Sequence, residues 1–178
     1  FREARELLQE RLQADPANVA ALKEMSKLEL DLGNGAAAVR WLDKLLEAEQ
    51  KDVDAHLTRA KVTYQTLGDL KKADTQLQFV INEYEKVAGD LLLPVLVHAA
   101  YVKAELGDVD AAQALAERAR GQNGAYAPAH YVLGRIYFAQ KKLDLAKQSL
   151  ETAVQQVKAA DPLYEPLVRA QLADVLAA

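Results

Sequence analysis

The sequence of 178 residues contains no cysteine and no long hydrophobic run. Without cysteine the chain can form neither a disulfide nor a thiolate metal site, but cytosolic and secreted proteins can both lack cysteine, so the compartment stays open. The most apolar stretch, residues 91–102, is interrupted by Pro94 and His98 and is too short to cross a bilayer. The chain shows no signal peptide and begins at Phe1, which suggests a processed or excised chain.

An excess of either charge is also missing. Lys and Arg together number 22 and Asp and Glu number 26, so the net charge is −4. This balance gives no electrostatic reason to expect nucleic acid or an anionic membrane as a partner. Because 51% of the residues are hydrophobic, the chain is able to bury a substantial core.

Sequence motifs of enzymes are absent as well. The chain has no phosphate-binding glycine loop, no zinc-protease helix and no strand that could carry a nucleophile turn. The three histidines, His56, His98 and His130, lie far apart without ligand spacing, so we interpret them as structural or surface residues. We therefore predict a protein that is not an enzyme and that needs no metal or cofactor.

The clearest positive pattern lies in residues 127–153. Leu133, Ile136 and Tyr137 recur at three- and four-residue steps, which places them on one side of a helix. Gly134 lies on the same side, and since glycine costs roughly 1 kcal/mol inside a helix, we predict that a partner helix approaches closely there. A second helical pattern follows the short polar turn at residues 140–142. The short connection predicts an antiparallel helical hairpin.

This hairpin resembles the tetratricopeptide repeat. With Ala127 as position 1, six residues match the positions of that pattern: Leu133, Gly134, Tyr137, Ala146, Leu150 and Ala153. The same layout recurs less cleanly from Val19, Asp54 and Leu93. The resemblance implies an all-α fold, a right-handed α-solenoid of antiparallel helix pairs with about ten helices.

The resemblance also implies one solenoid domain over residues 1–178. Its parts are the second helix of a truncated repeat (1–18), four full repeats (19–53, 54–92, 93–126 and 127–161) and the first helix of a truncated or capping repeat (162–178).

Helix boundaries can be predicted from the residues around them. Residues 2–14 form an amphipathic pattern, and Asp15-Pro16 and Asp161-Pro162 are interpreted as helix starts, with an aspartate cap and proline in the first turn. The interval between the second and third repeats is the longest, which predicts about five extra residues in a lengthened second helix around residues 80–90.

Turn chemistry predicts how the two helices of each repeat are joined. In Gly68-Asp69 the glycine accepts the left-handed conformation and the aspartate can cap the next helix. Gly107-Asp108 repeats this pair, and Gly33-Asn34 approximates it. Lys141 replaces glycine in the fourth turn, which predicts either a strain of roughly 1 kcal/mol or another geometry.

In this family the first helices of successive repeats line a concave surface that binds peptides or partner helices, and the resemblance implies such a surface here. The residues at or beside the positions that face it are Lys23, Lys27, Arg59, Val62, Val97, His98, Tyr101, Tyr131, Arg135 and Phe138. Its N-terminal half is expected to be basic and its C-terminal half aromatic and apolar. We therefore predict a scaffold that binds a protein or peptide segment, centred on Tyr101, Tyr131, Arg135 and Phe138, because tyrosine and arginine dominate interface energetics.

Several alternatives remain open. The aromatic rings either contact a partner or only pack between first helices, and the lysines either bind or form a solvated face. Trp41 is interpreted as an inter-helix packing residue or a partner contact. The chain matches only the first position of the lysine–asparagine clamp used by chaperone co-factors of the family, which disfavours that role.

The composition is similar to bacterial members, including those of envelope, secretion and exopolysaccharide-export systems. A second hypothesis is a structural spacer, or a module that forms homo-oligomers through its uncapped ends, with Leu8, Leu12, Leu172 and Val175 as the residues that matter.

Overall fold

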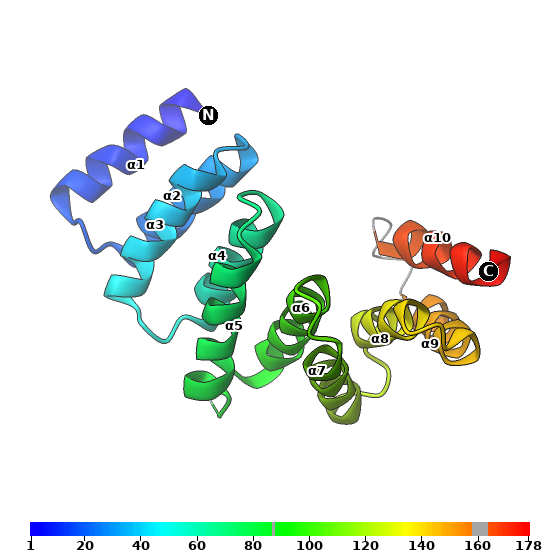
Figure 1. The fold of residues 1–178 in the computed structure, drawn as a ribbon. Helices are drawn as coiled ribbons and strands as arrows, with labels where there is room; N and C mark the ends of the chain where they lie inside the picture. Colours follow the sequence, from blue (N-terminus) through cyan, green and yellow to red (C-terminus); the bar gives the residue numbers. More distant parts are fainter. Residues whose placement is uncertain (87, 158–163) are drawn as a thin grey trace. The chain divides into compact units, whose positions relative to one another are not determined.

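The computed structural model describes residues 1–86, 88–157 and 164–178. Within those ranges the chain forms ten α-helices and one short 3₁₀ helix, η1, and no strand, so the expected all-α fold is confirmed (Figure 1). The helices are α1 (Arg2–Ala14), α2 (Val19–Asp31), α3 (Gly35–Ala48), α4 (Val53–Gln65), α5 (Leu70–Tyr84), η1 (Gly89–Leu91), α6 (Leu92–Glu105), α7 (Val109–Gln122), α8 (Ala127–Ala139), α9 (Leu143–Gln156) and α10 (Tyr164–Ala177).

The helices group into two compact units. Unit 1 is Phe1–Leu91 and unit 2 is Leu92–Ala178. In unit 1, α2 packs with α3 and α4 packs with α5, while α1 contacts α2 and α3 contacts α4. In unit 2, α6 packs with α7 and α8 packs with α9, while α7 and α6 both contact α8 and α10 packs on α9. The single domain with its four repeat boundaries stays a prediction.

The predicted close approach at Gly134 is confirmed in unit 2. A Cβ atom on Gly134 would lie 2.5 Å from Leu150 Cγ, on the facing helix α9. Tyr137, one turn from Gly134 on α8, is also buried, and its hydroxyl donates to Glu117 Oε1 of α7 at 2.8 Å. Helix α8 thus packs against both α7 and α9, and only glycine leaves room for α9 at that distance.

The turns inside the hairpins share one backbone conformation. Gly33, Gly68 and Gly107 all have positive φ, as predicted, and Lys141 adopts the same left-handed conformation with φ of 60°. In the fourth turn the backbone N–H of Lys142 donates to the Tyr137 carbonyl, five residues back, which is the hydrogen bond of a Schellman motif. Lys141 therefore takes up the strained geometry rather than an alternative one.

Capping of the helices differs from expectation at two places. Asp15 is the residue after α1, and the cap of α2 is Asn18, whose side chain accepts from the Ala21 N–H at 3.0 Å. The predicted helix start at Asp15-Pro16 is therefore wrong, because the turn ends three residues later. Asn34 is the N-cap residue of α3, but its side chain makes no capping hydrogen bond; its amide donates to Glu29 Oε2 at 2.8 Å.

The extra residues of the second repeat do not lengthen its second helix as predicted. Helix α5 has 15 residues, while α3, α7 and α9 have 14 each. The insertion instead follows α5, where Gly89–Leu91 form the 3₁₀ helix. The predicted helix start at Asp161-Pro162 lies outside the described residues.

Candidate functional site

Each unit carries a cleft between the first helices of two successive hairpins. In unit 1 a cleft of about 330 Å³, called here the α2/α4 cleft, is lined by Lys23, Glu24, Ser26, Lys27, Leu30, Leu42, Leu45, Asp54, Ala55 and Thr58. In unit 2 a cleft of about 200 Å³, the α6/α8 cleft, is lined by Tyr101, Ala104, Glu105, Val109, Val132, Arg135, Ile136 and Ala139.

An ordered arginine forms the centre of the α6/α8 cleft. The Arg135 guanidinium lies 4.9 Å from the centre of the Tyr101 ring, and its Nη2 donates to Glu105 Oε1 at 3.0 Å. Burial acts to lower the pKa of Arg135, but a hydrogen bond with Tyr101 and the neighbouring Tyr131 and Glu105 outweigh it and raise the pKa. The cation is therefore permanent, and its stacking and ion pair fix its direction.

The other predicted residues of unit 2 lie on the same two helices in different environments. Tyr131 and Phe138 are half-buried on α8, next to the cleft in sequence but outside its lining. His98 is half-buried on α6. Val97 is only 6% exposed and does not line the cleft, so it offers almost no surface to a partner.

In the α2/α4 cleft the predicted lysines face carboxylates. Lys23 and Lys27 are exposed and line the cleft, but Glu24 and Asp54 line it too. Lys23 Nζ also lies 2.6 Å from Oδ2 of Asp52. The surface expected to be basic is therefore one of mixed charge around these residues.

Asp52 combines two contacts. Its Oδ1 accepts from the Ala55 N–H at 2.9 Å and so caps α4, while Oδ2 pairs with Lys23. Burial acts to raise the pKa of Asp52, but the hydrogen bonds from Lys23 and Ala55 and the charge of Lys23 outweigh it, so the pKa is lowered. For Lys23, the hydrogen bond to Asp52 is the largest cause and raises its pKa.

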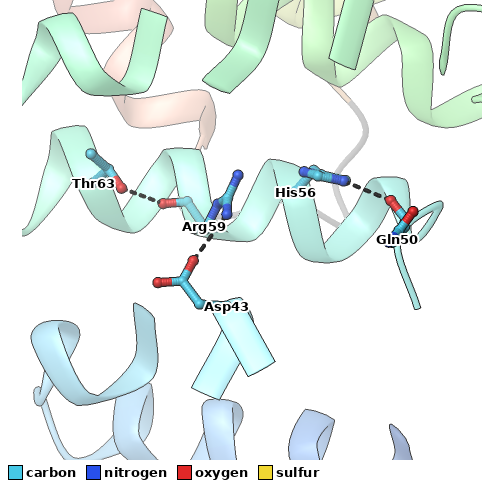
Figure 2. A network of polar contacts seen from close by, with 5 residues as sticks. All are labelled: Asp43, Gln50, His56, Arg59 and Thr63. Atoms are coloured by element: carbon cyan, nitrogen blue, oxygen red, sulfur yellow. Dashed lines mark hydrogen bonds and ion pairs between the residues drawn. The ribbon is translucent and has the colours of Figure 1, made fainter. Parts of the chain in front are cut away.

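Arg59 and Val62 lie away from the α2/α4 cleft. Figure 2 shows Arg59 pointing from α4 toward α3, where its Nη1 donates to Asp43 Oδ1 at 2.9 Å. Val62 is 6% exposed, and its Cγ1 would lie 3.3 Å from a Cβ atom on Gly35, the first residue of α3. Both side chains thus join α3 to α4 instead of facing a partner.

Two of the histidines have the structural role predicted for them. Nε2 of His56 lies 2.9 Å from the Gln50 carbonyl (Figure 2), and Nε2 of His130 lies 2.8 Å from the Gly124 carbonyl, six residues back in each case. His56 also packs against the rings of Phe79 and Tyr84. Burial lowers the pKa of His56, so the ring stays neutral near neutral pH.

The sequence reasoning missed Glu105, which lines the α6/α8 cleft, and Asp52, which pairs with Lys23 of the α2/α4 cleft. Glu105 follows Tyr101 by four residues, which places both on one side of α6, and this spacing was a signal for the contact with Arg135. Asp52 stands directly before the helical pattern of α4, where an aspartate is a preferred cap. Its contact with Lys23 on another helix had no local signal.

Among the described residues, no group of three or more His, Cys, Asp or Glu side chains is arranged to hold a metal ion. None of the helices in the described ranges has the length and apolar character needed to cross a membrane.

Comparison with known proteins identifies the repeat. The family model described as tetratricopeptide repeat matches residues 1–62 and 103–174, more than half of the chain. A comparison with curated protein sequences found no match.

Solved structures of the same architecture are similar over most of the chain. PilW, described as a widely conserved type IV pilus biogenesis factor, is 16% identical. The match covers 99% of this chain and 78% of the PilW chain, with a TM-score of 0.77. A thermophilic TPR protein of Thermus thermophilus is 19% identical. The match covers 97% of this chain and 89% of that protein, with a TM-score of 0.72. YrrB, described as a TPR protein with an unusual peptide-binding site, is 18% identical. The match covers 95% of this chain and 84% of YrrB, with a TM-score of 0.69.

Proposed function

Since this chain belongs to the tetratricopeptide repeat family, we propose that it is a non-enzymatic scaffold that binds a segment of another protein at the α6/α8 cleft. The bound segment is a peptide or a partner helix. The proposal includes a role in a larger bacterial assembly, such as an envelope or secretion system, where a pilus biogenesis factor of the same fold is a precedent.

The observation that carries this proposal is the position of Arg135 over Tyr101. The stacked pair lines a cleft whose other walls are mostly apolar, with Ala104, Ile136 and Ala139 among them. Arginine and tyrosine in a partly desolvated position are the residue types that contribute most to protein interfaces. The ion pair to Glu105 restricts the arginine before a partner arrives, which lowers the entropy that binding would cost.

The half-buried rings beside the cleft support a partner of some length. Tyr131 and Phe138 lie seven residues apart on α8, two helical turns, so they lie on one side of that helix. A segment that runs along α8 from the cleft would cover one or both rings. Its apolar side chains would fill the cleft, and a carboxylate or carbonyl group would meet Arg135.

The experiment is a selection of peptides from a random displayed library on the intact chain, followed by calorimetry with the selected peptides. We expect Tyr101→Ala and Arg135→Gln each to weaken binding at least about tenfold. Arg169→Gln on α10, which also removes an arginine paired with a glutamate, is the matched control and should leave affinity unchanged. Peptides that bind both cleft variants as tightly as the unchanged chain would contradict the proposal, as would a library that yields no binder.

A second candidate function is self-assembly, which exposed leucines on α1 and α10 favour. Leu7 on α1 is 59% exposed, and Leu167 and Leu176 on α10 are 56% and 61% exposed. Of the residues first considered, Leu8, Leu12 and Leu172 are half-buried, while Val175 is buried. Sedimentation over a range of concentrations tests this function: association that Leu167→Gln/Leu176→Gln abolishes would support it, and a monomer at all concentrations would reject it.

A further inference from the structure

A second cleft system in unit 1 lies between the helices α1 and α3. A cleft of about 760 Å³ and a neighbouring one of about 360 Å³ share three lining residues, Gln9, Trp41 and Lys44. Because the two are joined through these residues, we treat them as one trough, the α1/α3 trough. It shares no lining residue with the α2/α4 cleft.

The charges that line the trough are mostly positive. Arg5, Arg40 and Lys44 line it, and Glu29 is the one carboxylate among its lining residues. The chain as a whole has more acidic than basic residues, so this gathering of cations runs against its composition. The lining residues of the trough therefore carry a net positive charge, opposite in sign to the net charge of the molecule.

Both oxygens of the Glu29 carboxylate already have a partner within the chain. Its side chain is 8% exposed, Oε1 pairs with Arg5 Nη2 at 2.9 Å, and Oε2 accepts from Asn34 Nδ2 at 2.8 Å. Arg40 and Lys44 are exposed, and within the described part of the chain neither forms an ion pair. Two cations of the trough are thus available to an incoming anion.

Trp41 provides an apolar surface between the two clefts. One part of its side chain packs against the core cluster that includes Leu42 and Leu45, and the residue is half-buried. Lys44 Nζ lies 4.6 Å from the centre of the ring, which holds the lysine at the wall of the trough. A ligand side chain that covers the remaining ring surface would gain apolar contact next to that charge.

From this arrangement we propose that the α1/α3 trough is a second binding site, for an acidic protein segment that carries an apolar side chain. Its Asp or Glu carboxylates pair with Arg40 and Lys44, and its apolar side chain packs on Trp41. Gln9 and Gln13, which also line the trough, are able to hydrogen-bond to the backbone of the segment.

A protein segment fits this site better than a nucleic acid. The net charge of −4 repels a long polyanion, whereas a short acidic segment meets only the local charge of the trough. Sequence-independent nucleic-acid binding rests on many phosphate contacts along a basic surface, and here two available cations lie beside one aromatic ring.

Trp41 is the only tryptophan of the chain, so its fluorescence reports on the trough alone. The probe is a short synthetic peptide of alternating glutamate and leucine, titrated into the intact chain at physiological salt. We expect a saturable change in Trp41 emission, and about tenfold weaker binding of the same peptide with glutamine in place of glutamate.

Variants locate the site. Arg40→Gln/Lys44→Gln should weaken the glutamate peptide about tenfold, judged from the dissociation constant because Lys44 also affects the tryptophan spectrum. Lys71→Gln/Lys72→Gln removes the same charge from two exposed lysines outside the trough and should change affinity less than about twofold. Tyr101→Ala, in unit 2, should leave the affinity for the glutamate peptide unchanged. The proposal for the trough is thus tested independently of the proposal for the α6/α8 cleft.

Three results would overturn the proposal. The first is no change in emission at millimolar peptide. The second is equal binding of the glutamate and glutamine peptides, or equal loss of affinity in the two double variants. The third is a single-stranded DNA oligonucleotide that binds as tightly as the peptide, which would make the trough a site for polyanions in general.

Discussion

Arg135 on α8 lies with its guanidinium 4.9 Å from the centre of the Tyr101 ring on α6. The same arginine reaches Glu105, one turn further along α6, through Nη2. Because its partners stand on one side of α6, the arginine bridges two first helices and orders the wall of the cleft between them. A binding surface that is ordered beforehand loses less entropy when a partner arrives.

The close packing of α8 on α9 predicts the effect of a single methyl group. Gly134→Ala places a Cβ atom 2.5 Å from Leu150 Cγ, so the Leu150 side chain or α9 must shift, and the free energy of unfolding should fall by about 1–3 kcal/mol. Gly121→Ala in α7 is the control, because a Cβ atom there meets nothing within 4 Å. Its unfolding free energy should stay the same or rise by up to about 1 kcal/mol. Urea denaturation compares the two, and equal effects would refute the packing argument.

The turn at Lys141 predicts a stabilising substitution. Its φ of 60° is left-handed, which costs a residue with a Cβ atom roughly 1–2 kcal/mol, while glycine is free of that cost. The greater freedom of glycine in the unfolded chain offsets part of the gain. Lys141→Gly should therefore raise the free energy of unfolding by about 0.5 kcal/mol. Gly107→Lys is the reverse change at a φ of 84° and should lower the free energy of unfolding. Thermal denaturation checks both variants: a lower melting temperature for Lys141→Gly, or a higher one for Gly107→Lys, would contradict the account.

The ion pair between Asp52 and Lys23 predicts a dependence of stability on pH. The pKa of Asp52 is lower in the folded than in the unfolded protein, so the pair contributes fully above the ordinary aspartate pKa. That contribution is lost as the pH falls through the lower, folded value. Asp52→Asn keeps a good helix cap and removes the charge, so it should cost roughly 0.5–1 kcal/mol at pH 7 and much less near pH 3.

Denaturation of both proteins at the two pH values checks this prediction. Lys23→Gln should show a similar cost at pH 7, since it removes the other partner. A cost of Asp52→Asn that is the same at both pH values would mean that the pair does not stabilise the fold.

Local sequence patterns were sufficient for the helices and most of their turns. Steps of three and four residues mark the helices, and Gly33, Gly68 and Gly107 have the positive φ that their place after a helix predicts. The position of Gly134 among larger residues predicted the approach of α9 because a glycine on a packed face needs such a reason. These features depend on residues close together in the chain.

Features that depend on the neighbouring helix could not be predicted in this way. Val62 occupies a position that the repeat assigns to the binding surface, but Gly35 lets α3 come close and Val62 is buried there. Val97 is also buried, on helix α6, which both α7 and α8 contact. Arg59 turns to Asp43, 16 residues back, a contact that no local spacing encodes.

The side-chain contacts of Asp52 and Glu29 could not be predicted for the same reason. Asp52 pairs with Lys23 on a different helix. The Glu29 carboxylate accepts a hydrogen bond from the side-chain amide of Asn34, and the Asn34 side chain makes no capping hydrogen bond to α3. These pairings depend on which helices are neighbours in the tertiary structure, and the repeat pattern does not specify them.

The most direct test of the binding proposal is chemical-shift mapping by NMR with a peptide selected on the intact chain. The account predicts that the largest shifts of backbone amides fall on α6 and α8 around Tyr101 and Arg135, and that they disappear in Arg135→Gln at the same peptide concentration. Shifts confined to other helices, or shifts around the cleft that persist unchanged in Arg135→Gln, would contradict it.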